Sequence, residues 1–126
     1  MAVTAPIVET AVHRSRTWKA TAYSGVALLV LVTVHMVAHH FVVEEVGGLR
    51  TYAQVLDYIS NPVMFVIEVL FLVVVTTHAM LGLRSVLFDF GLSVDAKRLV
   101  ARGLLVLGIL TVAYGVTLVS VLASRA

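Results

Sequence analysis

Residues 63–88 read VMFVIEVLFLVVVTTHAMLGLRSVLF, and this stretch decides the fold. The hydrocarbon core of a bilayer is about 30 Å thick, and an α-helix that rises about 1.5 Å per residue crosses it in ~20 apolar residues. Because no water inside the bilayer can bond to exposed backbone amides, an apolar run of this length is expected to be helical. Residues 23–43 and 99–122 form two further runs of this kind. The sequence therefore predicts an all-α membrane protein with three transmembrane helices.

The composition supports one membrane domain over residues 1–126. Hydrophobic residues make up 60% of the chain and charged residues 13%, whereas an average soluble domain is roughly 25% charged. A short chain leaves a large fraction of its surface exposed, so lipid must cover much of this apolar surface. The chain has no cysteine, which excludes disulfides and thiolate-held iron–sulfur or zinc sites.

The connections between the apolar runs also carry local signals. Residues 51–59 have apolar side chains at helical spacing and predict a short surface helix. Asn-Pro at 61–62 marks the start of the second long helix. Residues 89–93 predict a tight turn, after which Ser93 or Asp95 caps the third helix.

The distribution of basic residues predicts the orientation in the membrane. Cytoplasmic loops carry an excess of Lys and Arg. Seven of the nine basic residues precede the first long helix or flank the second turn, and the other two lie on the opposite side: Arg14, Arg16, Lys19, Arg84, Lys97, Arg98 and Arg102 against Arg50 and Arg125. We therefore expect the N-terminus inside and the C-terminus outside.

Ionisable residues inside the apolar runs are the candidate functional residues, because they are costly in lipid. His35 and His39 are four residues apart and share one helix face, and His40 is turned about 100° away. Glu68 and His78 lie in the second run. From residue type alone, these histidines are either ligands of a cofactor or members of a polar cluster that joins the helices.

The surroundings of His78 suit a flat cofactor. Gly82, Ser85 and Asp89 follow it along nearly the same helix face. An imidazole can reach a haem iron axially, and a glycine one turn away lets the macrocycle lie against the backbone. Arg84, near the inner surface, is able to pair with a haem propionate or polarise a quinone carbonyl.

The motif that begins at His78 resembles the second transmembrane helix of the membrane-anchor subunits of succinate dehydrogenase. Those subunits carry His, Gly at +4, an aliphatic residue at +5, and Asp followed by Tyr or Phe at +11 and +12. Here these positions are His78, Gly82, Leu83, Asp89 and Phe90. The first run adds a second match, because the family often has Ser-Gly near the inner end and His eleven residues after the Ser. Ser24, Gly25 and His35 have that spacing.

The resemblance, which is closest to the small D-type cytochrome b subunit, implies that the chain binds haem b. His78 would be an axial ligand, and a second anchor subunit would supply the opposite one. Many relatives hold two haems, and the second would take His35, with His39 as the alternate. Neighbouring helices lie about 8–10 Å apart, too close to sandwich a porphyrin squarely. His35 and His78 of one chain are therefore not expected to share an iron, although one haem with a structural His35 remains open.

The resemblance also implies a haem or quinone environment near the inner surface. On the matching helices, this environment would be formed by Ser24, Gly25, Gly82, Arg84, Ser85 and Asp89.

The function implied is that of a non-catalytic anchor subunit in the respiratory chain and the tricarboxylic acid cycle. It would pair with a second anchor subunit into a helical bundle. The bundle would fix a flavoprotein and an iron–sulfur subunit to the cytoplasmic (inner) membrane and help form a site that passes electrons from succinate to quinone. The chain itself is expected to perform no dicarboxylate chemistry, because no soluble domain that could house flavin is evident, and no nucleic-acid partner is expected. Two alternatives stay open: a cytochrome b anchor of another respiratory dehydrogenase, and a non-haem structural or proton-relay subunit.

Overall fold

The computed structural model describes residues 16–40 and 50–126, and every regular element in these ranges is a helix. Three helices are long, α1 (Arg16–His40), α3 (Pro62–Asp89) and α4 (Val94–Ala123), and one is short, α2 (Tyr52–Ser60). By length and composition, α1, α3 and α4 could each cross a membrane. The predicted all-α class with three long apolar helices is confirmed.

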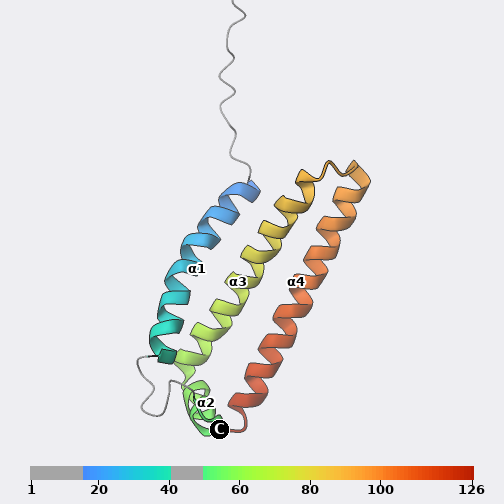
Figure 1. The fold of residues 1–126 in the computed structure, drawn as a ribbon. Coiled ribbons are helices and arrows are strands. Elements are labelled where there is room, and N and C mark those ends of the chain that lie inside the picture. Colours follow the sequence, from blue (N-terminus) through green and yellow to red (C-terminus); the bar gives the residue numbers. More distant parts are fainter. Residues whose placement is uncertain (1–15, 41–49) are drawn as a thin grey trace, which may run out of the picture.

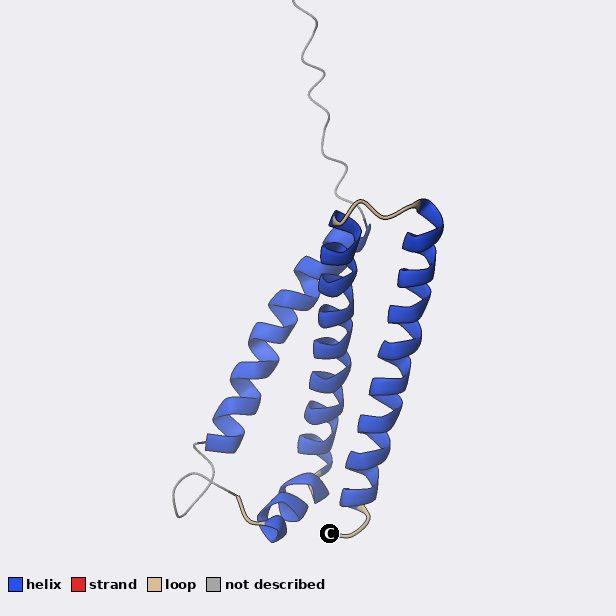
Figure 2. Cartoon of the chain, turned by 45° about the vertical axis from the view of Figure 1, so that its right-hand side comes forward, coloured by secondary structure: helices blue, strands red, loops and turns tan. Residues whose placement is uncertain are grey.

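The three long helices lie in a row with α3 in the middle (Figures 1 and 2). α3 contacts both α1 and α4, whereas α1 and α4 do not contact each other within the described ranges. The short helix α2 packs against α3 and α4. α3 is therefore the element through which any site between helices of this chain must be built.

The helix ends extend beyond the apolar runs. α1 begins at Arg16 and α4 at Val94, whereas the apolar runs begin at residues 23 and 99. Hydropathy marks the part of a helix that lipid can cover, while backbone hydrogen bonding continues into the polar flanks until a cap ends it. Residues 41–43 of the first predicted span lie outside the described residues.

Specific caps define the other boundaries. Thr51 and Gln54 form a reciprocal capping box at the start of α2. The side chain of Asn61 accepts the backbone N–H groups of Val63 and Met64, ahead of α3, with Pro62 at its first position. Of the two expected caps of α4, Ser93 is the one whose side chain accepts a backbone N–H, that of Ala96.

Very little of the apolar surface is buried within this chain. In the described ranges no side chain is fully buried, and only Ala38, Ile59, Leu104 and Thr76 are largely buried. Large apolar side chains along all three long helices remain exposed. Lipid or other membrane helices must cover them, because exposed apolar area on this scale is unfavourable in water.

Candidate functional site

His78 of α3 is held against α1 by a hydrogen bond to Ser24. The distance from His78 Nδ1 to Ser24 Oγ is 3.0 Å. The Ser24 hydroxyl also donates to the carbonyl oxygen of Thr21 at 3.0 Å. A hydroxyl has one proton, so once that proton is donated, its lone pairs are left to accept the Nδ1–H of His78. In the neutral imidazole, this arrangement places the proton on Nδ1 and leaves the lone pair on Nε2.

Gly25 makes this approach possible. A Cβ atom built at Gly25 would lie 3.2 Å from Cε1 of His78, so even an alanine here would require the ring to shift by a few tenths of an ångström. Gly82, one turn beyond His78, has open space where its Cβ would be. The first glycine therefore admits the histidine, and the second leaves room beside it.

A second polar cluster lies at the opposite end of α1, around Glu68 of α3. Nδ1 of His35 lies 3.0 and 3.1 Å from the two carboxylate oxygens of Glu68. Nε2 of His39 lies 3.3 Å from Oε1 of Glu68. The hydroxyl of Tyr58, from α2, donates to Oε1 of Glu68 at 2.7 Å. Side chains from α1 and α2 thus converge on one carboxylate of α3.

Aromatic and basic groups enclose this cluster. The rings of His35 and Phe71 stack at 4.8 Å, and those of His39 and Tyr58 lie 4.7 Å apart. The guanidinium of Arg50 lies 4.4 Å from the centre of the Tyr58 ring and donates to the carbonyl oxygen of Ala38 at 2.6 Å. Arg50 therefore caps the end of α1 and screens one side of the cluster.

Burial raises the pKa of Tyr58 well above its ordinary value of 10.0, and its hydrogen bond to the Glu68 carboxylate raises it further. Both effects disfavour the phenolate. Tyr58 is therefore a permanent hydrogen-bond donor to Glu68 at neutral pH.

Ligand atoms of His35, His39 and Glu68 all lie within 4.8 Å of one another. Two imidazoles and one carboxylate form a donor set that metal ions accept. The same three groups are, however, already satisfied by hydrogen bonds to one another and to Tyr58.

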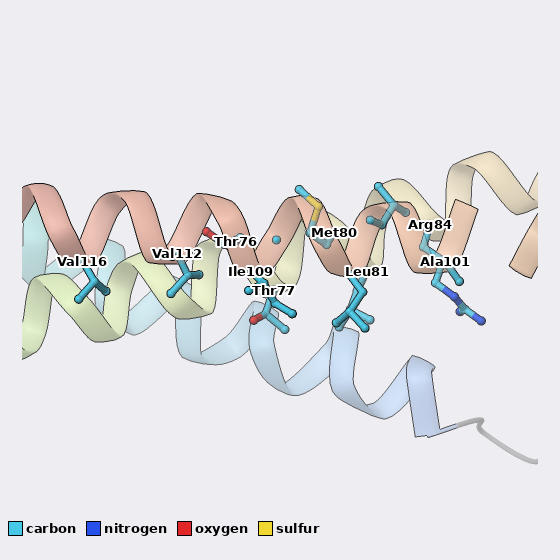
Figure 3. Close-up of a pocket in the computed structure, with 13 residues that line it drawn as sticks. Thr76, Thr77, Met80, Leu81, Arg84, Ala101, Ile109, Val112 and Val116 are labelled. Atoms are coloured by element: carbon cyan, nitrogen blue, oxygen red, sulfur yellow. The ribbon is translucent and has the colours of Figure 1, made fainter. Parts of the chain in front are cut away.

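Arg84 lies elsewhere, in a groove of about 740 Å³ between α3 and α4 (Figure 3). The groove is lined mainly by apolar and small side chains, and Arg84 is its single charged lining residue. The guanidinium of Arg84 also lies 4.3 Å from the centre of the Phe88 ring, and Nζ of Lys97 lies 5.5 Å from the same centre. The groove is therefore apolar along its length with a cation at one end, near the turn between the helices.

The structure thus separates the residues that the sequence grouped together. Ser24 and Gly25 meet His78, as their spacing along α1 allows, and His35 lies in the other cluster with Glu68. His40 is exposed. Ser85 and Asp89 are exposed near the end of α3, and the guanidinium of Arg84 lies over the ring of Phe88.

Sequence reasoning missed Tyr58 and Arg50 as parts of a site. Glu68 supplied an indirect signal, because a carboxylate inside an apolar helix needs donors. The identity of those donors depends on how α2 folds back onto α3, which has no local signature. Phe71 was missed because an aromatic residue in an apolar helix is unremarkable in sequence.

Comparison with known proteins identifies the family. The model of the succinate dehydrogenase/fumarate reductase transmembrane subunit family matches residues 9–117. The chain is also 27% identical over 106 residues to the succinate dehydrogenase hydrophobic membrane anchor subunit of Thermoplasma acidophilum, a match that covers 84% of each chain. No solved structure matches the chain. With three long apolar helices and a family match over most of its length, the chain belongs to the transmembrane anchor subunits of succinate dehydrogenase/fumarate reductase.

Proposed function

We propose that this anchor subunit binds haem b through Nε2 of His78, and a second haem b through Nε2 of His35. A second anchor subunit would supply the opposite axial ligands. Together the two anchors would fix the flavoprotein and iron–sulfur subunits to the cytoplasmic face of the inner membrane and help form the quinone site. In this orientation the N-terminus is inside and the C-terminus outside.

The observation that carries the proposal is the pairing of His78 with Ser24. Histidines that ligate metals usually donate their other ring N–H to an oxygen, which sets the tautomer and the ring orientation. His78 has this arrangement, with Nδ1 3.0 Å from Ser24 Oγ. Gly82 beside it leaves open space for a flat group. The residues present therefore fit a haem ligand and its surroundings.

His35 fits a second ligand better than its alternate His39. The Glu68 carboxylate accepts from Nδ1 of His35 but from Nε2 of His39. Nε2 points away from the side-chain stem and is the nitrogen that reaches an axial position with least crowding. His35 keeps that nitrogen available, whereas His39 uses it on Glu68.

His35 and His78 belong to two separate clusters, at Glu68 and at Ser24. This separation supports two haems held by one chain in place of one haem shared by both histidines. When bound, each haem supplies a one-electron redox centre in the membrane.

The groove between α3 and α4 supports a place for the quinone. A quinone in the membrane combines a long apolar tail with a polar head that carries carbonyl oxygens. The apolar lining suits the tail, and Arg84 is able to donate to a carbonyl at the end near the exposed Ser85 and Asp89. Phe90, directly after Asp89, has no hydroxyl to donate, so partner subunits would supply further donors.

The test is the dithionite-reduced spectrum and the haem-to-flavin ratio of the purified complex. We expect His78→Ala and His35→Ala each to remove one haem, and His39→Ala to remove none. Unchanged haem content in His78→Ala would contradict the assignment of that ligand. The activity of the flavoprotein subunit with an artificial electron acceptor serves as the control for assembly.

A second candidate function is that of a non-haem structural anchor, in which the same hydrogen bonds only join the helices. The complete bonding of Glu68 by three donors favours it. An assembled complex without Soret absorbance would establish this alternative.

A further inference from the structure

Glu68 is less exposed than the two histidines of the cluster around it. Its side chain is 13% exposed, compared with 28% for His35. Among the described residues it is the one acidic residue of a long helix that lies more than a turn from both helix ends. Placing a carboxylate within a membrane helix costs free energy, so such a residue is expected to have a function, here an effect on a neighbouring group.

The carboxylate sets the tautomer of His35. An ionised carboxylate can only accept hydrogen bonds. Since Nδ1 of His35 lies within 3.1 Å of both oxygens, it must carry the proton, and Nε2 keeps its lone pair. Stacking of the imidazole on Phe71 at 4.8 Å then limits rotation of the ring.

Tyr58 affects how strongly the Glu68 carboxylate accepts the hydrogen bond from His35. Its hydroxyl donates to Oε1 at 2.7 Å and withdraws charge from the oxygen that also faces His35 and His39. Tyr58 comes from α2, which the capping box at Thr51 starts and Asn61 ends. The connection between α1 and α3 is therefore joined physically to the environment of His35.

On the basis of the proposed function, we infer that Glu68 is a positioning residue for His35, and that it lowers the reduction potential of the haem that His35 ligates. A carboxylate hydrogen-bonded to Nδ1 makes the imidazole a stronger donor and stabilises the more positive, oxidised iron. Tyr58 moderates this effect, because its hydrogen bond draws charge from the carboxylate. His39, which shares Oε1, helps to orient Glu68 and is not a ligand.

Two substitutions should change the potential in opposite directions. Glu68→Gln keeps an oxygen that accepts from Nδ1–H but removes the charge, so the midpoint potential of one haem should shift upward. Tyr58→Phe removes a donor to Glu68 at nearly constant volume, so the same potential should shift downward. A purely structural role would not produce shifts of opposite sign.

The experiment is an optical redox titration of the purified complex, with electron paramagnetic resonance of the oxidised haems. The wild type, Glu68→Gln and Tyr58→Phe are compared, and His39→Gln is the matched control, expected to keep the ligand spectrum of the wild type. The haem ligated by His78 should keep its potential in all variants. Shifts of the same sign, or no shift in Tyr58→Phe, would overturn the inference.

The outcomes separate this inference from the proposed function. If His35→Ala keeps both haems, the assignment of His35 itself fails. If His35→Ala loses one haem while Glu68→Gln and Tyr58→Phe leave its potential unchanged, only the role of Glu68 fails. If Glu68→Gln loses the haem altogether, Tyr58→Phe is the deciding variant. A downward shift of its potential supports the inference, and the absence of a shift overturns it. A stoichiometric divalent metal in the complex, lost in both Glu68→Gln and His39→Gln, would also overturn the inference.

Discussion

At the scale of single residues, His35 and His78 differ in the oxygen that accepts a hydrogen bond from each. His78 faces a neutral hydroxyl, that of Ser24, whereas His35 faces the carboxylate of Glu68. Both contacts use Nδ1 and leave Nε2 available. A hydrogen bond to a charged group is stronger than one to a neutral group, so the two imidazoles differ in donor strength although they share a tautomer.

Replacement of Ser24 tests the first of these contacts. Ser24→Ala leaves the Nδ1–H of His78 without an acceptor, at a cost of about 1 kcal/mol for a half-buried group. This cost lowers the equilibrium constant for the ring position seen in the structure by roughly fivefold. We expect lower haem occupancy after mild detergent washing, measured as the haem-to-flavin ratio. Ser24→Thr retains a hydroxyl and should behave as the wild type, and equal losses in both variants would contradict this reading.

At the scale of elements, α4 packs on α3 through glycines. A Cβ at Gly108 would lie 3.3 Å from Cγ of Met80, and one at Gly115 would lie 2.5 Å from Cδ2 of Leu72. Small residues let membrane helices approach closely, so that van der Waals contacts replace the hydrophobic effect that lipid does not supply. The groove that contains Arg84 lies along this same pair of helices.

The glycine contacts predict a position-dependent effect within one helix. Gly115→Leu overfills the contact with Leu72 and should destabilise the α3–α4 pair by about 1–3 kcal/mol. Gly103→Leu is the matched control, because nothing lies within 4 Å of its Cβ position. Unfolding of the isolated chain by sodium dodecyl sulfate in mixed micelles measures the difference, and equal stability of the two variants would contradict it.

The short helix α2 carries a pH-dependent contact through Tyr58. Because the pKa of Tyr58 in the folded chain is raised above 10.0, the stability that this contact contributes is fully present below pH 10.0 and is lost as the pH rises through the folded pKa. The difference in phenolate absorbance between the wild type and Tyr58→Phe should therefore appear only well above pH 10.0. In a Glu68→Gln background this component should move to lower pH, and titration at the ordinary value in the wild type would contradict the contact.

At the scale of the whole molecule, three helices in one row cannot enclose a cofactor by themselves. α1 and α4 have no contact in the described ranges, and large apolar side chains stay exposed along every long helix. A second layer of helices is needed to complete a bundle around the row. This requirement agrees with the family, whose members are the transmembrane part of a larger complex.

The ends of the row also differ in charge, which predicts the topology. Figure 1 shows that α1 begins at the same end as the turn between α3 and α4, where most basic residues lie. Since the chain has no cysteine, single cysteines report on each end. In right-side-out vesicles an impermeant maleimide should label Ala126→Cys but not Asp95→Cys. After lysis both should react, and the reverse pattern would contradict the proposed orientation.

The number and type of the helices could be read from the sequence, because the thickness of a bilayer and its lack of water impose length and hydrogen bonding on every apolar run. The local stops at Asn61-Pro62 and Ser93 were readable for a similar reason, since capping depends on neighbours in the chain. The spacing of Ser24, His35 and His78 also marked the helix faces that carry polar groups.

Only the tertiary structure decided which polar groups meet. The rotation of α1 against α3 brings Ser24 to His78 and His35 to Glu68, and the return of α2 brings Tyr58 to Glu68. Helical periodicity defines a face but not the neighbour that the face will contact. Faces that contact lipid and faces that pack on another helix can be equally apolar. The sequence by itself determined three membrane helices and a family motif, and packing of side chains determined the tautomer and the partner of each histidine.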